Sequence, residues 1–221
     1  MKAVLFDFDG TIADTIPVLT EAVNQTLVAL GYPGHQTVKG FINHGARELM
    51  RGALPADRQS DEELLDTAFA LYQQTYRKLY LQTDKLYAGL FEVMEQIGRR
   101  ARLGILSNKP DEMTQGLARQ LFPAGMMRAV VGFEDGKPGK PDPYLAEKAA
   151  RALGVPLCNC LLVGDSDVDI ATAKNAGMQF VGAGWGFLGA KALYAAGADR
   201  VAQTPGDLPA ALEDFLNETK D

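Results

Sequence analysis

The stretch KAVLFDFDGT, residues 2–11, decides the fold, because it joins a short apolar run to a pair of aspartates. A nearly continuous apolar run is typical of a strand that is buried on both faces of a parallel sheet. Asp7 and Asp9 lie two residues apart at the end of the run, so both carboxylates can face the crevice where open α/β sheets bind ligands. Gly10 then allows a sharp turn. We predict a buried first strand that ends in two functional carboxylates.

Similar apolar runs recur along the chain and alternate with helical patterns. The runs cover 102–107, 128–132, 160–164 and 178–182, and clear helical patterns cover 142–153 and 167–176. Strands that alternate with helices are typical of a mostly parallel sheet with helices on both faces. The sequence therefore predicts the α/β fold class.

Residues 14–83 break this alternation. They show only helical periodicity, most clearly over 61–81, and no strand-like run. The residues of 61–81 that are spaced for one helix face are Leu65, Ala68, Tyr72, Tyr76 and Leu79. We predict a helical insertion of residues 14–83, with a catalytic core formed by 1–13 and 84–221.

The composition is that of an ordinary water-soluble globular protein, with 47 % hydrophobic and 23 % charged residues among 221. The net charge is −6 and no cluster of lysine and arginine stands out, which argues against nucleic acid as a main partner. No apolar stretch is long enough to cross a bilayer, and Asp7 interrupts the apolar start too early for a signal peptide. We expect a cytoplasmic monomer or homodimer that binds neither nucleic acid nor membrane.

The two cysteines, Cys158 and Cys160, are separated by one residue. Such a pair could bind a metal or form a strained disulfide, but the chain has only two histidines and so lacks a zinc-binding set. Both cysteines adjoin an apolar run, where a thiol packs as a small hydrophobic group. We predict two reduced, structural cysteines.

Three more polar segments lie where the same sheet should present its other strand ends. Residues 107–109 (SNK) and 164–169 (GDSDVD) follow predicted strands, and Lys140 precedes a predicted helix. Asp165 supplies, with the carboxylates of the first strand, hard oxygen ligands that suit Mg²⁺ rather than zinc or copper. A lysine together with serine and asparagine suits a phosphoryl group. The combination predicts a magnesium-dependent site for a small phosphorylated metabolite.

These segments resemble, in order, the four motifs of the haloacid dehalogenase superfamily over nearly the whole chain. The resemblance implies a doubly wound core with a helical cap inserted after the first motif. Within the superfamily the chain is similar to phosphoglycolate phosphatases at residues 40–54 (GFINHGARELMRGAL), 107–110 (SNKP) and 185–187 (WGF). It departs from them at Gly52, where the family often has arginine.

The resemblance also implies the roles of the metal-site residues. Asp7 is implied as the nucleophile that forms a phosphoaspartate. Asp9 is implied as general acid and then general base, and as a metal ligand through its backbone carbonyl. Asp165 completes the expected Mg²⁺ site of Asp7, Asp9 and Asp165.

A second implied group holds the phosphoryl oxygens: Ser107, Asn108 and Lys140. Two Lys-Pro pairs carry the signature of the third motif, at Lys137 and Lys140, and we favour Lys140 because residues 140–143 (KPDP) lead straight into a helix. Asp169 is expected to orient either Lys140 or a metal-bound water.

Two other functions compete with a phosphatase. A sugar phosphomutase of the same superfamily would use the same Asp7 and Asp9 but return the phosphoryl group to its substrate. A non-catalytic binding or regulatory module on the same fold would need neither both carboxylates nor the cations. Dehalogenase and phosphonate-cleaving enzymes are disfavoured because they have no use for the second aspartate.

The predicted cap carries a further candidate group. Arg47 and Arg51 are spaced i, i+4 in a segment that reads as a helix, and His44 lies three residues before Arg47. A small substrate such as 2-phosphoglycolate has a carboxylate that the core motifs leave without a partner. One hypothesis is therefore that these three residues bind the substrate carboxylate; the other is that they are solvated surface cations.

Overall fold

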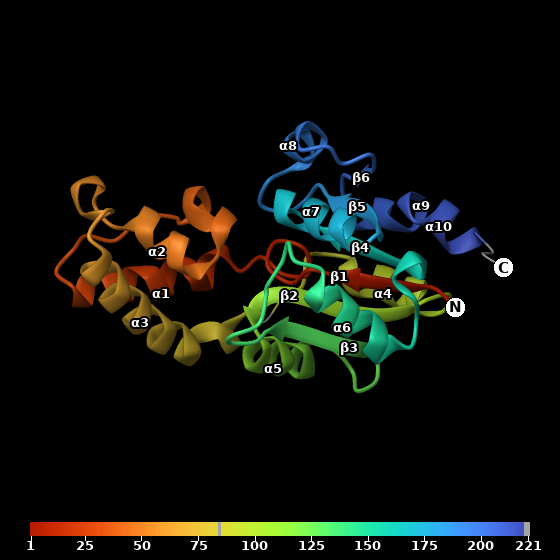
Figure 1. The fold of residues 1–221 in the computed structure, drawn as a ribbon, viewed down its shortest axis with the longest axis horizontal. Helices are drawn as coiled ribbons and strands as arrows, with labels where there is room; N and C mark the ends of the chain where they lie inside the picture. The colour runs from red at the N-terminus through yellow and green to blue at the C-terminus, as the bar shows by residue number, and fades with distance from the viewer. Residues whose placement is uncertain (84, 219–221) are drawn as a thin grey trace. The chain divides into compact units, whose positions relative to one another are not determined.

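The computed structural model describes residues 1–83 and 85–218, apart from the side chains of Asn43 and His44. The chain forms two compact units (Figure 1). The core unit consists of Met1–Asp14 and Asp84–Asp221, and the second unit, which we call the cap, consists of Thr15–Thr83.

The core unit is built on a parallel sheet of six strands in the order β3-β2-β1-β4-β5-β6. The strands are β1 (Ala3–Phe6), β2 (Arg102–Pro110), β3 (Met127–Phe133), β4 (Cys160–Gly164), β5 (Gln179–Ala183) and β6 (Val201–Ala202). All five predicted strands are present, and β6 is an addition of two residues. The predicted α/β class is confirmed.

β1 lies at the centre of this sheet. Phe6 pairs with Ile105 of β2 on one side and with Val163 of β4 on the other. The strand order therefore reverses at β1, and the carboxyl end of such a switch point is where open α/β sheets bind ligands. The four residues of β1 are fully buried, as the apolar run predicts.

Helices cover both faces of the sheet (Figure 1). The core unit contains α4 (Leu90–Gly98), α5 (Asp111–Leu121), α6 (Tyr144–Leu153), α7 (Asp167–Asn175), α8 (Ala190–Ala195), α9 (Leu208–Ala211) and α10 (Glu213–Asn217). Leu5 and Leu162 pack with buried residues of α6 and α7. Because strand side chains alternate between faces, Val4 and Phe6 are buried on the opposite face.

The cap consists of helices and turns, with α1 (Ile16–Ala29), α2 (Ala46–Ala53) and α3 (Glu62–Leu79) as its α-helices. α3 packs on both α1 and α2. Asp61 caps its N-terminus, since the carboxylate accepts a hydrogen bond of 3.0 Å from Leu64 N. Of the five residues predicted on one face of α3, Leu79 is only half-buried and the other four are buried.

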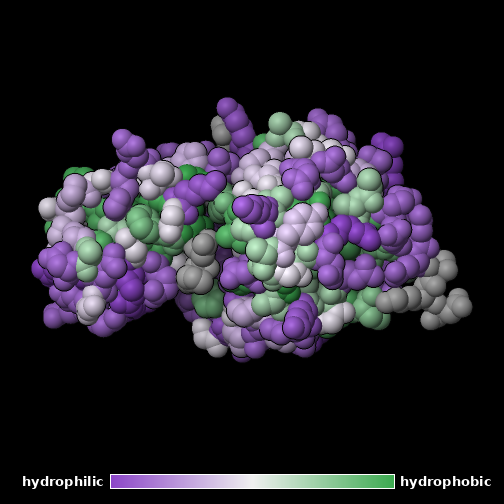
Figure 2. All heavy atoms as spheres, turned by 90° about the horizontal axis from the view of Figure 1, so that it is seen from above, coloured by the Kyte–Doolittle hydropathy of each residue, from purple (hydrophilic) through white to green (hydrophobic). Residues whose placement is uncertain are grey.

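Polar side chains dominate the faces of both units that Figure 2 shows. Among the described residues, the exposed large apolar side chains are those of Met1, Val28, Leu81 and Tyr194. No helix in residues 1–83 or 85–218 combines the length and the apolar character that a bilayer span requires. The two cysteines are not joined in a disulfide. Cys160 is buried, as a structural thiol should be, and burial raises its pKa to about 11, whereas Cys158 is exposed and is not packed as we predicted.

Candidate active site

The candidate site begins where β1 ends. Asp7 follows the strand directly, and its backbone N donates a hydrogen bond of 2.9 Å to Val163 O at the end of β4. The chain then turns at Gly10, whose φ of +80° is in the region that favours glycine. A Cβ at Gly10 would lie 2.1 Å from Asp165 Oδ2, so this turn leaves room for a carboxylate from β4.

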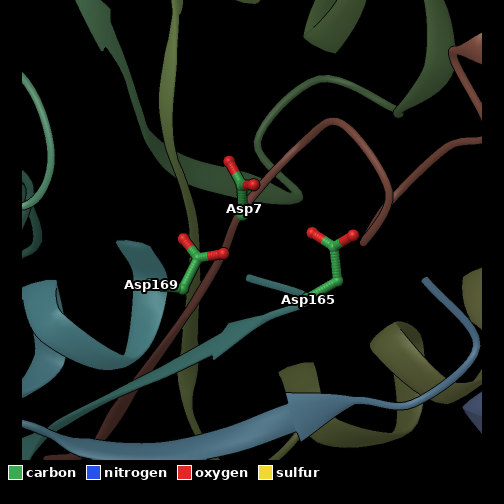
Figure 3. Close-up of side chains that lie close together, drawn as sticks. All are labelled: Asp7, Asp165 and Asp169. Atoms are coloured by element: carbon green, nitrogen blue, oxygen red, sulfur yellow. The ribbon is translucent and has the colours of Figure 1, made fainter. Parts of the chain in front are cut away.

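Asp7, Asp165 and Asp169 form a buried carboxylate cluster (Figure 3). One oxygen of each lies within 4.8 Å of the others. Asp7 comes from the end of β1, Asp165 from the end of β4, and Asp169 from the first turn of α7. Three converging carboxylates are a donor set that fits a hard divalent cation. The residues present can therefore hold a metal ion.

Asp165 is held in place from two sides. Its Oδ2 accepts a hydrogen bond of 2.7 Å from Phe187 N, and its Oδ1 accepts one of 3.3 Å from Thr11 Oγ1. Burial raises the pKa of Asp165 well above its usual range, and the neighbouring charges of Asp169 and Asp7 raise it further. A bound cation would oppose both effects.

Lys140 contacts two of the three carboxylates of the cluster. Its Nζ lies 2.8 Å from Asp7 Oδ1 and 2.6 Å from Asp169 Oδ1, and only 3 % of its side chain is exposed. Burial alone would lower the pKa of Lys140, but the carboxylates of Asp169 and Asp7 outweigh it and raise that pKa. Lys137 is exposed. The structure therefore selects Lys140 from the two lysines that the sequence offers.

Burial also raises the pKa of Asp7, to about 7; Lys140 opposes the rise and Asp169 adds to it. The cluster holds three carboxylates and one ammonium group, a formal charge of −3 + 1 = −2 when all are ionised. A divalent cation would neutralise that charge. The charge of the cluster and the oxygen atoms that it offers thus both fit a divalent cation.

Asp169 is fixed by the start of its own helix. Its Oδ2 accepts hydrogen bonds of 2.6 Å from Ser166 Oγ and 3.2 Å from Ser166 N, while its backbone N donates to Ser166 Oγ. This capping box at the N-terminus of α7 leaves Oδ1 directed at Lys140. The geometry agrees with the expected orienting role of Asp169.

The Asp9 carboxylate lies apart from the three-carboxylate cluster. Its Oδ1 is 3.2 Å from Lys109 Nζ, and 26 % of its side chain is exposed, against 2 % for Lys109. The expected contribution of Asp9 to the metal site uses its backbone carbonyl, which leaves the carboxylate free for proton transfer. Lys109 is therefore a buried neighbour of the candidate acid and base.

The side chain of Asn108 contacts the Lys140 backbone. Its Oδ1 accepts a hydrogen bond of 2.7 Å from Lys140 N, and its Nδ2 donates one of 3.0 Å to Lys140 O. Both ends of the amide are thus bonded to the Lys140 backbone, and one N–H of the amide remains for a phosphoryl oxygen. Ser107 is buried and accepts a hydrogen bond from Lys109 N. Asn108 therefore bonds to both backbone groups of Lys140.

Three residues near the site have contacts that the sequence does not reveal. Thr11 reads as a turn residue, yet its hydroxyl bonds to Asp165. Trp185 donates from Nε1 to Thr11 O over 3.0 Å, which places the only tryptophan of the chain beside the same turn. Burial, with the charges of nearby aspartates, raises the pKa of Tyr87 above its usual range.

In the cap, Arg47 and Arg51 both pair with Glu62 of α3, at 3.0 Å and 2.7 Å. Arg47 also pairs with Asp66, and Arg51 with Glu48. The carboxylate partners are largely exposed. The third candidate of this group, His44, has a side chain outside the described part of the structure.

Comparison with known proteins gives consistent results. A family model of haloacid dehalogenase-like hydrolases matches residues 1–177. A phosphoglycolate phosphatase from Neisseria meningitidis is 31 % identical over 97 % of this chain and 94 % of its own length, and phosphoglycolate phosphatase 1 from Pseudomonas aeruginosa is 30 % identical over 84 % and 70 %. The crystal structure of a protein provisionally named a phosphoglycolate phosphatase, from Lactobacillus delbrueckii subsp. bulgaricus, superposes with a TM-score of 0.86 and 27 % identity, over 99 % of this chain and all of its own.

The position of Asn108 leads to a first prediction. Asn108→Ala removes two hydrogen bonds to the Lys140 backbone, each worth about 1 kcal/mol, so kcat should fall by roughly tenfold or more with a smaller change in KM. Steady-state kinetics with an aryl phosphate, with circular dichroism to verify folding, measures this.

Asn175→Ala is the matched control for this prediction. Its side chain donates one hydrogen bond of 3.0 Å to Pro141 O, the next residue of the same loop, and it is exposed. We expect a small change in kcat. Equal effects of the two substitutions would contradict a special role for Asn108, and a selective rise in KM for Asn108→Ala would return it to the phosphate-binding group.

Proposed function

We propose that this chain, which belongs to the haloacid dehalogenase-like hydrolase family, is a Mg²⁺-dependent phosphatase that acts on 2-phosphoglycolate. The observation that carries the proposal is the buried cluster at the end of β1. There Asp7 lies against Lys140 and beside two more carboxylates, with Asp9 two residues away. This arrangement supports the proposed roles of Asp7 as nucleophile, Lys140 as a stabilising cation and Asp9 as the acid and base.

In the first half of the proposed reaction, a carboxylate oxygen of Asp7 attacks phosphorus and the bond from phosphorus to the ester oxygen breaks. Asp9 donates its proton to the departing alkoxide, and Asp7 is left as a phosphoaspartate. Lys140 and Ser107 stabilise the negative charge on the phosphoryl oxygens. Asn108 keeps Lys140 in place through its two backbone bonds.

In the second half, water attacks the phosphorus of the phosphoaspartate. Asp9 accepts the proton of the water, the bond between phosphorus and Asp7 breaks, and inorganic phosphate leaves. The ammonium group of Lys109 beside Asp9 would stabilise the ionised carboxylate, which is the form that acts as the base. Asp7 is then an ionised carboxylate again and Asp9 is protonated again, as both were before the first step.

The proposed metal ligands are the carboxylates of Asp7 and Asp165 and the backbone carbonyl of Asp9, with Asp169 adjoining them. A bound Mg²⁺ would supply positive charge that keeps Asp7 ionised and withdraws charge from the phosphoryl oxygens. The chain contributes burial, since Asp7, Asp165 and Asp169 are all less than one-tenth exposed, and so keeps water away from these interactions.

The substrate assignment rests on the names of the relatives and on the cap. Proteins named phosphoglycolate phosphatase match this chain at about 30 % identity. The substrate of that name carries a carboxylate beyond its phosphoryl group, and a guanidinium from the cap would pair with it in bidentate geometry. Arg47 is our proposed partner. Its present pairs with Glu62 and Asp66 are exposed, and exposed ion pairs hold weakly enough for a substrate carboxylate to replace them.

The direct test is phosphate release by the purified protein over a panel of small phosphate esters with Mg²⁺. We expect 2-phosphoglycolate to have the highest kcat/KM. A sugar phosphate together with its bisphosphate should yield free phosphate and no isomer. Formation of the isomer would show that the chain is a mutase.

The second prediction concerns the nucleophile. Asp7→Asn is nearly isosteric, so the fold should persist while turnover and phosphoenzyme formation fall below detection. Asp167→Asn is the control, because Asp167 is an exposed aspartate at the start of α7 and should leave kcat nearly unchanged. Phosphate release by Asp7→Asn at near wild-type rate would remove Asp7 as nucleophile.

The third prediction concerns the metal. Excess chelator should abolish activity, and Mg²⁺ should both restore it and raise the melting temperature, because it binds the folded carboxylate cluster. Ca²⁺ should inhibit, since its longer and looser coordination would misplace Asp7. Asp165→Asn should lose most of the thermal shift with Mg²⁺, while Asp167→Asn keeps it. Full activity in chelator would contradict the metal assignment.

The fourth prediction concerns the cap. Arg47→Ala should raise KM for 2-phosphoglycolate by roughly ten- to a hundredfold more than KM for p-nitrophenyl phosphate, which lacks the carboxylate. Arg58→Ala is the matched control, because Arg58 also forms an ion pair within the cap, at 2.6 Å from Asp61. Equal changes for both substrates, or none, would leave Arg47 as a surface residue and direct attention to Arg51 and Lys109.

A further inference from the structure

A hollow lies at the amino ends of β2 and β3, whereas the carboxylate cluster lies at the carboxyl ends of the strands. Its walls are the C-terminal part of α4, the start of β2 and the segment that leads into β3, all within the core unit. Its volume is about 740 Å³. Sites for small organic ligands commonly fall between about 300 and 1,000 Å³, so the hollow is large enough for one.

The lining of this hollow is strongly cationic. Four arginines contribute to it: Arg99, Arg100, Arg102 and Arg128. Glu95 is the only acidic residue in the lining, although the chain as a whole carries a net charge of −6. Arginines that gather against the overall charge of a protein create a local positive field that collects anions.

The four guanidinium groups differ in their partners. Arg100 pairs with Glu213 at 2.9 Å and also bonds to Asn217, and Arg102 donates to Leu153 O. Among residues 1–83 and 85–218, no carboxylate lies within salt-bridge distance of Arg99 or Arg128. Among the described residues, no carboxylate therefore occupies the guanidinium donors of Arg99 and Arg128, and these donors can bind an anion.

Helix electrostatics explains part of this pattern. Arg99 follows the last residue of α4, where a cation complements the negative end of the helix dipole. Arg128, however, belongs to the edge strand β3, and sequence separates it from Arg99 by almost thirty residues. Pairing between β2 and β3 is what brings it to the same hollow. A dipole effect at α4 does not account for that convergence.

The rest of the lining is apolar. Pro123 is exposed and Met126 is partly exposed, whereas Met94 and Leu103, which also line the hollow, are buried. Methionine adapts its shape to a ligand and makes favourable contacts with aromatic rings. The hollow therefore offers a planar apolar group a surface beside donors that match a phosphoryl group in bidentate geometry.

We propose that this hollow binds an organic phosphate with an apolar ring, of the nucleotide class, with the phosphoryl groups at Arg99 and Arg128. The site is separate from the carboxylate cluster, because it occupies the amino ends of the strands while Asp7 and Asp165 follow carboxyl ends. It would let such a ligand bind without competing with the substrate.

Isothermal titration of the full-length protein with ADP, in excess EDTA to prevent turnover, tests the proposal. We expect saturable binding that weakens at least tenfold in the Arg99→Ala/Arg128→Ala double variant. Arg119→Ala/Arg151→Ala is the matched control, since it removes two exposed arginines that do not line the hollow and changes the net charge equally. That control should bind ADP like the wild type.

Titrations with adenosine and with inorganic phosphate test the two parts of the ligand separately. Adenosine and inorganic phosphate should each bind at least tenfold more weakly than ADP. The proposal is overturned if ADP does not bind, or if the Arg99→Ala/Arg128→Ala protein binds it as tightly as the wild type. If adenosine binds as tightly as ADP, the assignment of the phosphoryl groups to Arg99 and Arg128 is overturned. If inorganic phosphate binds as tightly as ADP, the assignment of the ring to the apolar part of the lining is overturned. Phosphatase kinetics and a melting curve of the double variant verify that it remains folded.

Discussion

The buried ammonium of Lys140 is the interaction on which the rest of the site depends. Removing a lysine and two aspartates from water carries a large desolvation penalty, and close pairing is what offsets it. The distances of 2.8 Å and 2.6 Å to Asp7 and Asp169 provide that pairing. Without Lys140, the carboxylates of the cluster would repel one another in a buried space. β1, β4 and α7 can therefore place acidic groups together only if this cation lies among them.

The surrounding contacts are arranged to hold that cation and its partners. Asn108 bonds to both backbone groups of Lys140, and Ser166 fixes the far oxygen of Asp169. Gly186 approaches Asp165 so closely that a Cβ there would lie 2.3 Å from the Asp165 Cβ. The contacts of Asn108 and Ser166 come from a strand end and a helix start, which position side chains more accurately than free loops do, and Gly186 lies in the turn after β5. The residues that we propose for the chemistry are thus held within the core unit, whereas Arg47, the proposed partner of the substrate carboxylate, belongs to the cap.

The sequence predicts most of the sheet because its strands are continuous apolar runs, and buried parallel strands have that pattern. It does not reveal β6, whose two residues are too few to form a run. It identifies Asp7, Asp165 and Lys140 by position and residue type. It does not reveal the bonds between Asn108 and Lys140, because an amide can bond to backbone or ligand equally well and only the fold shows that Lys140 N and O lie within reach. The arginine-lined hollow escapes notice for a related reason, since strand pairing brings Arg128 to it.

The charge of the cluster also constrains the order of events in the reaction that we propose. When all of its groups are ionised, the cluster of three carboxylates and one ammonium has a charge of −2, and the raised pKa values of Asp7 and Asp165 show that this form is unfavourable without a cation. A phosphate monoester is itself close to a dianion at neutral pH, so it would meet a site of its own sign. A divalent cation brings the cluster to zero and leaves Lys140 free to interact with the phosphoryl oxygens. The electrostatics therefore favour binding of the metal before the substrate.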